Sequence, residues 1–210
     1  MIDVNIIETN LRFGGLNRRF KTDLIVIHHT GSVRDTDCSA AQIHDVHLNN
    51  GWAGIGYHFV IRKDGTIERG RPEWAVGAHA GENGMNAHSI GIHLSGDFNA
   101  AQPTSQQIES TAMLIAYLCD KYNIPTDRQH IKGHFEVGST DCPGKNLIDK
   151  LDIISGKANW YRYPQKPSPD VVVKDLIIIK SANAIAADTK AKIKAILDYA
   201  DVKFEVSTSQ

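Results

Sequence analysis

Residues 24–30 read Leu-Ile-Val-Ile-His-His-Thr, an apolar run that ends in two histidines and a threonine. A short, continuous apolar run rich in β-branched side chains is typical of a central strand covered on both faces of a sheet. Because side chains alternate along a strand, His28 and His29 should point to opposite faces. Only one of the two can therefore reach a site that other segments share.

A polar loop farther along the chain offers partners for that histidine. Residues 133–144 read Gly-His-Phe-Glu-Val-Gly-Ser-Thr-Asp-Cys-Pro-Gly, which places His134 and Cys142 on one short segment. A lone Cys142 could be a small buried hydrophobic residue, but this loop has little apolar surface to bury it. A catalytic zinc typically takes three protein ligands and leaves one position for water, and imidazole and thiolate both suit it. We therefore predict a Zn2+ site made by His134, Cys142 and a histidine of the strand, with His28 as the candidate.

A structural zinc site is the alternative to this open, catalytic one. A structural site has four protein ligands and no free position. The sequence offers no fourth ligand at typical spacing, and His29 stays open for that role. The other histidines near apolar segments are interpreted as core or capping residues, namely His44, His47, His58 and His88.

Length and composition narrow the function classes. The chain has 210 residues, enough for one domain with an appendage or for two small domains. Hydrophobic residues make up 41% and charged residues 22%, and a formal net charge of -1 argues against a nucleic-acid partner. No stretch approaches the roughly 20 apolar residues that a membrane span needs, and residues 1–5 lack the features of a secretory signal. We expect the protein to fold in a cytoplasm.

Cysteine and histidine usage indicates where the chemistry lies. The three cysteines, Cys38, Cys119 and Cys142, form an odd and sparse set that does not suit a disulfide framework. Cys119 falls on the apolar stripe of a predicted helix and is interpreted as structural, whereas Cys38 has no assigned role. All 10 histidines fall within residues 28–134. The reactive part of the protein should therefore occupy the first three quarters of the chain.

Local signals predict alternating strands and helices in this part of the chain. Capping boxes begin two helices, one at Ser39 with Gln42 and one at Thr104 with Gln107. An Asp-Gly turn at residues 64–65 joins two runs that alternate at period two, which predicts a β-hairpin. The expected elements are an irregular arm over 1–23, strands over 24–27, 57–62, 66–70, 89–94 and 129–132, and helices over 39–49, 103–122 and 146–154.

The composition changes after residue 155. Residues 156–169 contain three prolines and no periodicity, as a stiff linker would. Residues 170–210 then predict a small β-α-β unit that is too small to bury a core of its own. We therefore expect a domain over 1–155 that holds the metal site, a linker over 156–169, and a unit over 170–210 that packs on the first domain, on a second copy or on a partner.

Six short motifs occur in order along residues 26–144. They are Val26-Ile27-His28-His29-Thr30, Gly56-Tyr57-His58-Phe59, Asp64-Gly65-Thr66-Ile67, Val76-Gly77-Ala78-His79, His88-Ser89-Ile90-Gly91-Ile92, and Gly133-His134 through Cys142-Pro143-Gly144. Together they resemble the type-2 N-acetylmuramoyl-L-alanine amidases, a family that includes amidase-type bacteriophage lysozymes and animal peptidoglycan recognition proteins. An ordered set of six motifs is far more specific than any one of them.

The resemblance implies both a fold and an activity. The fold would be α/β, with a central mixed β-sheet flanked by helices. The activity would be hydrolysis of the amide bond between the lactyl group of muramic acid and L-alanine in bacterial peptidoglycan, with one Zn2+ as cofactor. The zinc ligands would be His28, His134 and Cys142, which selects His28 over His29.

Further site residues are implied by the same motifs. Tyr57 matches a tyrosine beside the metal, and Thr140 takes the place of a lysine or threonine near the cysteine ligand; both would be catalytic. His79 matches a groove histidine that contacts substrate. Trp52 and Asn86 are additional candidates for substrate binding.

One position departs from the pattern of many bacterial relatives. They have a glutamate, thought to act as the base, where this chain has His93. The phage lysozymes and the recognition proteins lack that glutamate too, so its absence does not exclude activity. His93 is therefore a candidate catalytic residue here.

The resemblance also suggests a biological setting. The chain resembles a phage or prophage endolysin, a bacteriolytic and antimicrobial enzyme that stays in the host cytoplasm and attacks the cell wall after release. Residues 170–210 would then bind the wall or form a homodimer. A cytoplasmic muropeptide-recycling amidase is one alternative. A non-catalytic module that binds peptidoglycan is another, although such relatives usually lack a ligand, commonly the cysteine that this chain retains.

Overall fold

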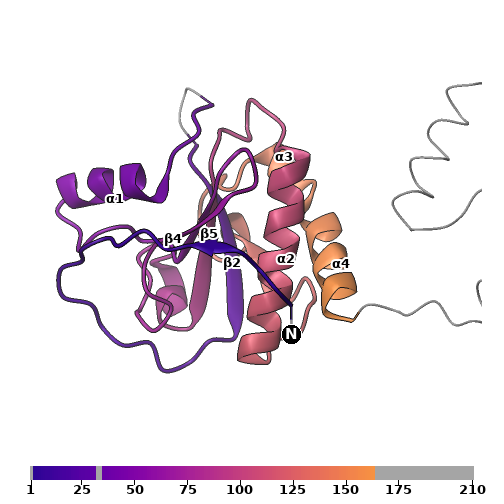
Figure 1. Ribbon diagram of the computed structural model, residues 1–210, viewed down its shortest axis with the longest axis horizontal. Coiled ribbons are helices and arrows are strands. Elements are labelled where there is room, and N and C mark those ends of the chain that lie inside the picture. Colours follow the sequence, from indigo (N-terminus) through magenta and orange to yellow (C-terminus); the bar gives the residue numbers. More distant parts are fainter. Residues whose placement is uncertain (1, 32–34, 164–210) are drawn as a thin grey trace, which may run out of the picture. The chain divides into compact units, whose positions relative to one another are not determined.

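The apolar run of residues 24–27 is the start of β2, Leu24–His29, which lies inside a six-stranded sheet. The computed structural model describes residues 2–31 and 35–163 (Figure 1). The strand order is β1-β4-β3-β5-β2-β6. The other strands are β1 Ile6–Ile7, β3 Phe59–Ile61, β4 Ile67–Arg69, β5 Ser89–Leu94 and β6 Ile131–Gly133.

The sheet is mixed, as the resemblance implies. β2 pairs in parallel with both β5 and β6, and β5 pairs in parallel with β3. The one antiparallel pair joins β3 to β4 across the Asp-Gly turn, which confirms the predicted hairpin. β1 adds to the edge of β4, so the arm predicted as irregular contributes a short strand.

Helices cover both faces of this sheet. α2, Ser105–Tyr122, and α4, Leu151–Arg162, lie on one side, and α1, Ala40–Asn49, lies on the other (Figure 1). The short elements are η1 Glu82–Ala87, η2 His134–Glu136 and α3 Lys145–Ile148. The larger apolar core fills the space between the sheet and α2 with α4, and it includes Ile25 and Ile27. Since side chains alternate, His28 belongs to the opposite face of β2, toward α1.

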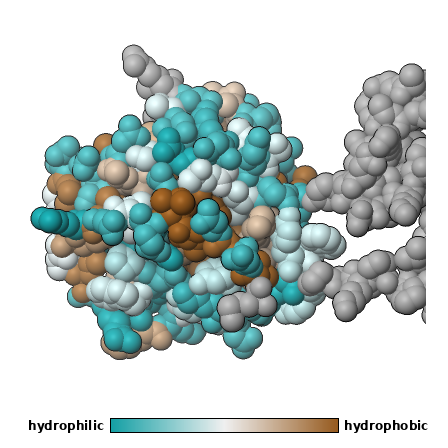
Figure 2. Space-filling view, viewed as in Figure 1, coloured by the Kyte–Doolittle hydropathy of each residue, from teal (hydrophilic) through white to brown (hydrophobic). Residues whose placement is uncertain are grey.

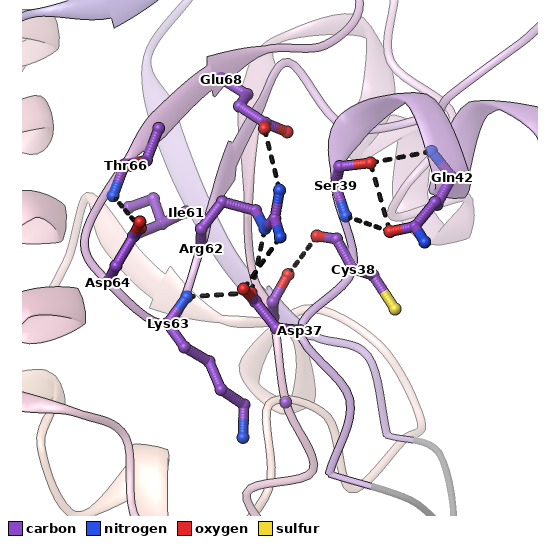
Figure 3. A network of polar contacts seen from close by, with 12 residues as sticks. Asp37, Cys38, Ser39, Gln42, Ile61, Arg62, Lys63, Asp64, Thr66 and Glu68 are labelled. Atoms are coloured by element: carbon purple, nitrogen blue, oxygen red, sulfur yellow. Dashed lines mark hydrogen bonds and ion pairs between the residues drawn. The ribbon is translucent and has the colours of Figure 1, made fainter.

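Both predicted capping boxes are present. The side chains of Ser39 and Thr104 accept hydrogen bonds from the backbone N–H of the glutamine three residues on, and each glutamine bonds back. A polar network then fixes the start of α1 to the β3–β4 hairpin (Figure 3). Asp37 accepts from the Arg62 guanidinium at 2.9 and 3.0 Å, and Arg62 also donates to Glu68 at 3.2 Å. This network fixes the segment that leads into α1 against the hairpin.

The C-terminal end of the domain predicted over 1–155 differs from the prediction. The helix expected over 146–154 is divided into α3 and α4, and α4 continues to Arg162. Ile154 and Ala158 are fully buried in the core that α2 shares, so packing keeps residues 156–162 helical. The boundary predicted at residue 155, and with it the start of the linker over 156–169, was placed too early. The rest of that linker and the predicted β-α-β unit over 170–210 lie outside the described residues.

An apolar patch lies near the middle of the described part in the view of Figure 2. The patch lies over β1, at the edge of the sheet, where Ile7 is 46% exposed. No helix among residues 2–31 and 35–163 is long and apolar enough to cross a membrane.

Candidate metal centre

His28, His134 and Cys142 converge at the carboxyl end of β2. One possible ligand atom from each residue lies within 4.8 Å of the other two. The sheet register brings the two histidines together: Ile27 is paired with Gly133, so the residues that follow leave neighbouring parallel strands at the same level. The ring centroids of His28 and His134 are 4.5 Å apart.

The spacing of these atoms fits a zinc ion. Cys142 Sγ lies 3.7 Å from His28 Nδ1, so Nδ1 is the nitrogen of His28 that faces the group. Tetrahedral zinc with nitrogen ligands near 2.0 Å and sulfur near 2.3 Å would separate two nitrogens by about 3.3 Å and a nitrogen from the sulfur by roughly 3.5 Å, close to the spacing found here. Two imidazoles and one thiolate are also a donor set that zinc favours. The residues present therefore fit the metal that the resemblance implies.

The loop between the two later ligands is closed by its own hydrogen bonds. Phe135 N–H donates to the carbonyl of Cys142 at 2.8 Å, which returns the end of the loop to its beginning. Cys142 N–H donates to Thr140 Oγ1 at 3.2 Å, and Ser139 N–H donates to Glu82 Oε2 at 2.9 Å. The loop thus presents Cys142 through backbone contacts and not through burial in a core.

His29 faces the other side of the sheet. Its Nδ1 accepts a hydrogen bond from Phe98 N–H at 3.2 Å, and its ring stacks on Phe98 with centroids 6.0 Å apart. It is not part of the three-residue group found among the described residues. A closed structural site with His29 as fourth ligand therefore has no support in this arrangement.

Without a metal, the ligand side chains His28 and Cys142 are themselves uncharged near neutral pH. Burial, reinforced by the nearby His79 and His134, holds the pKa of His28 well below its ordinary value, so its imidazole is uncharged at neutral pH. Burial raises the pKa of the Cys142 thiol to about 12, against a smaller opposing effect of the His29 backbone. A bound divalent cation reverses this preference, because a coordinating thiol is deprotonated.

Tyr57 stands beside the ligands with a free hydroxyl. Its ring centroid lies 5.1 Å from that of His28 and 4.6 Å from that of His93. Burial, with a smaller contribution from Cys142, raises the pKa of Tyr57 far above its ordinary value, so the phenol keeps its proton. None of the described residues forms a hydrogen bond with this hydroxyl, and it is available as a donor.

Thr140 is exposed and lies on the ligand loop. Its Oγ1 accepts from Cys142 N–H at 3.2 Å, so the hydroxyl is oriented by the backbone that carries the cysteine. A hydroxyl that accepts one bond can still donate its own hydrogen. Thr140 can therefore also serve as a donor.

His93 occupies a less favourable place for the predicted catalytic role. It pairs with His28 across β2 and β5 and is 2% exposed. Its Nε2 is 3.1 Å from Thr30 Oγ1, and its Nδ1 is buried without a partner among the described residues. Burial lowers the pKa of His93 to about 3. A buried imidazole of such low basicity is a poor general base. Its ring packs against the ring of Tyr57, and this contact is the role that the structure supports.

The three predicted substrate-binding residues have different surroundings. Trp52 is 45% exposed, and its ring lies 4.5 Å from that of His47. Asn86 uses its side-chain oxygen internally, accepting from the backbone N–H of His79 at 2.8 Å and of Ala80 at 2.9 Å. His79 is only 8% exposed, with its Nδ1 3.0 Å from His28 Nε2. Only Trp52 therefore presents an open surface, and His79 lies behind a metal ligand instead of in a groove.

Two residues near the site were missed from the sequence. His47, interpreted as a core or capping residue, lies between Trp52 and Tyr57, with ring centroids 4.5 and 5.8 Å away. Glu82 holds Ser139 of the ligand loop and raises the pKa of His134 against the larger lowering by burial. Glu82 comes from the Gly- and Asn-rich segment 77–88, which has no periodicity from which its direction could be predicted.

A surface pocket of about 790 Å³ is present elsewhere. It is lined in part by Phe20, Trp74 and Tyr122 and includes none of the predicted site residues. The chemistry of the converging side chains, and not cavity size, identifies the site.

The mixed sheet and the three converging residues define a class of protein. It is an α/β domain with a His, His, Cys group at the carboxyl end of a central strand, an arrangement suited to a hydrolytic metal centre. Within that class, the chain belongs to the N-acetylmuramoyl-L-alanine amidase family, whose model matches residues 18–145.

Individual relatives agree with this assignment. The chain is 35% identical over 135 residues to the endolysin of Escherichia phage T7, covering 62% of this chain and 85% of that protein. It is 34% identical over 172 residues to peptidoglycan-recognition protein SC2 of Drosophila melanogaster, covering 76% and 90%. The solved N-acetylmuramoyl-L-alanine amidase LysC from Clostridium intestinale URNW has a TM-score of 0.66 and 44% identity, over 75% of this chain and 99% of that one. These relatives confirm the predicted family and fold and support N-acetylmuramoyl-L-alanine amidase activity on peptidoglycan.

Proposed function

We propose that this chain is a zinc-dependent amidase that cleaves the bond between the lactyl group of muramic acid and L-alanine. The observation that carries the proposal is the convergence of His28, His134 and Cys142 within 4.8 Å, beside the ring of Tyr57. These three residues would hold Zn2+, which would act as a Lewis acid toward a carbonyl and lower the pKa of water.

The side chains around the ligands would complete the reaction. Tyr57 and Thr140 would donate hydrogen bonds to the carbonyl oxygen as negative charge develops on it. Burial keeps Tyr57 protonated, and the Cys142 backbone orients Thr140. A positioned donor of this kind contributes about 2.7–4 kcal/mol to transition-state stabilisation. Trp52, with its exposed ring, is the residue we propose for direct contact with substrate.

Metal and product analysis of the purified chain test this function. We expect one zinc per chain, and digestion of purified peptidoglycan should release new L-alanine amino termini without new reducing sugar ends. Removing zinc with a chelator should stop the release, and adding zinc back should restore it. New reducing ends would instead identify a glycosidase and contradict the amidase assignment.

A binding-only function is the second candidate. The relatives include proteins named for peptidoglycan recognition, such as SC2, and one solved relative, a point mutant of Drosophila PGRP-LB, is described in complex with tracheal cytotoxin. The retained Cys142 favours hydrolysis over recognition alone. Tight binding of muropeptides with no release of L-alanine termini in the same assay would establish the recognition function.

The biological role we propose is cell-wall lysis by an endolysin. Its support is the 35% identity to the endolysin of a bacteriophage. Such an enzyme would be bacteriolytic and antimicrobial, acting on the wall after release from the host cytoplasm, and residues 170–210 would bind the wall or mediate a homodimer. A chain that ends at residue 163 keeps α4 whole. We expect it to lose either wall binding in a pelleting assay or self-association in sedimentation; retention of both would contradict this role for the segment.

A further inference from the structure

His79 occupies a slot that is shaped for its ring. The residue is 8% exposed, and its Nδ1 lies 3.0 Å from His28 Nε2. Glycines flank it on two sides: a Cβ added at Gly77 or at Gly91 would lie 2.5 Å from His79 Cδ2. Real Cβ atoms essentially never approach another atom so closely, so both positions require glycine. The ring of His79 consequently has little freedom to move toward a substrate.

The backbone on either side of this ring is fixed as well. Asn86 Oδ1 accepts from the N–H of His79 and of Ala80 at 2.8 and 2.9 Å. Gly77 N–H donates to the carbonyl of Asn86 at 3.1 Å, which closes the same loop from the other side. The direction of His79 is therefore set by this loop in the absence of any ligand.

The protons of the two rings can be assigned from their neighbours. His28 Nδ1 faces Cys142 Sγ, so a metal-binding His28 uses its Nδ1 lone pair and carries its proton on Nε2. That Nε2–H points to His79 Nδ1, which must then accept. A neutral His79 that accepts at Nδ1 has its own proton on Nε2. His79 Nε2 is buried and forms no close hydrogen bond with the described residues, although the Ser89 backbone lies near enough to raise the pKa of the ring against the larger lowering by burial.

We propose that His79 is a positioning residue of the metal centre, which accepts the Nε2–H of His28 and so presents the Nδ1 lone pair of His28 to Zn2+. The inference rests on the proposed zinc-dependent function. It replaces the direct substrate contact that the resemblance implies for His79. A metal-ligating histidine usually donates its second N–H to a carboxylate, a carbonyl or water. Here a neutral imidazole takes that place, and its own Nε2 has no close hydrogen bond within the described residues.

Zinc affinity, measured by competition with a chelator, tests the role without recourse to activity. His79→Ala removes the acceptor and should weaken zinc binding about 10- to 100-fold, the usual effect of losing an outer partner of a metal ligand. His79→Asn places an amide oxygen near the position of Nδ1 and should recover most of the affinity. His44→Ala is the matched control, since His44 is 4% exposed, accepts from Ile55 N–H and is not part of the ligand group. It should lower the melting temperature and leave zinc affinity unchanged.

The outcomes separate this inference from the proposed function. If the parental chain binds no zinc, the proposed function itself fails. If the parental chain binds zinc and His79→Ala binds it as tightly, only the positioning role is overturned. A second test needs no variant and uses NMR of the zinc-loaded full chain with 15N-labelled histidine. NMR should find the protons of both His28 and His79 on Nε2, and a proton on His79 Nδ1 would overturn the inference.

Discussion

Replacing Cys142 by serine should remove zinc and abolish amide hydrolysis while the fold persists. A serine hydroxyl stays protonated near neutral pH and is a poorer partner for zinc than a thiolate. Polarisation of the carbonyl by the metal lowers the activation free energy by several kcal/mol, and each 1.36 kcal/mol changes the rate tenfold. We therefore expect the rate of hydrolysis to fall on the order of 10³-fold or more. Zinc content per chain and release of L-alanine termini from peptidoglycan measure both effects. The fold should survive because Cys142 belongs to neither apolar core.

Cys38→Ser is the matched control for this substitution. Cys38 is also a half-buried free cysteine, but it packs beneath α1 and is not part of the ligand group. Its serine variant should keep parental zinc content and rate. Full zinc occupancy and rate in Cys142→Ser, with the same measurements, would show that the loop cysteine is not a ligand.

The choice of His28 illustrates what local patterns can and cannot determine. Strand alternation requires that one of His28 and His29 face away, and the structure confirms this, since His29 lies against Phe98. Alternation alone does not say which of the two meets the loop. That depends on the pairing of Ile27 with Gly133, a contact between distant segments that leaves no local signal. Family motifs supplied the choice that periodicity could not.

Elements with strong local signals were predicted well, and an element held by packing was not. The Asp-Gly turn and the capping boxes at Ser39 and Thr104 depend on neighbouring residues, and each appears where it was predicted. α4 continues through Gly156, a poor helix former, because Ala158 in the next turn is buried against the core. Tertiary packing there overrides intrinsic propensity, which is a weak guide by itself.

The same distinction applies to the site. Residue types could be matched to zinc chemistry from the sequence, but burial decides what each residue can do. His93 was a candidate because of its position in β5, yet burial lowers its pKa to about 3. His79 was expected in a groove, yet the glycines around it place it behind His28. The order of motifs along the chain does not show whether a residue lies in front of a metal ligand or behind it. That placement depends on how the sheet and its loops pack.

Replacing Tyr57 by phenylalanine should slow hydrolysis about 10²- to 10³-fold, the usual effect of losing one donor to a developing oxyanion. The phenyl ring keeps the contacts with His28 and His93, so zinc content and thermal stability should be unchanged. The turnover rate on purified peptidoglycan, determined beside zinc content, separates loss of the donor from loss of the metal. Because pKa elevation keeps Tyr57 protonated, the ratio of parental to variant rate should stay constant between about pH 6 and 9, whereas a tyrosine acting as its anion would make that ratio rise with pH.

Tyr117→Phe serves as the control, because Tyr117 lies on α2 and its hydroxyl contacts Lys121 and no site residue. Thr140→Ala removes the second proposed donor from an exposed position, where water can partly replace it, so its loss should be smaller than that of Tyr57→Phe. If both Tyr57→Phe and Thr140→Ala hydrolyse peptidoglycan at the parental rate, neither residue stabilises the oxyanion. Rate loss in Tyr57→Phe alone would assign that stabilisation to the Tyr57 hydroxyl.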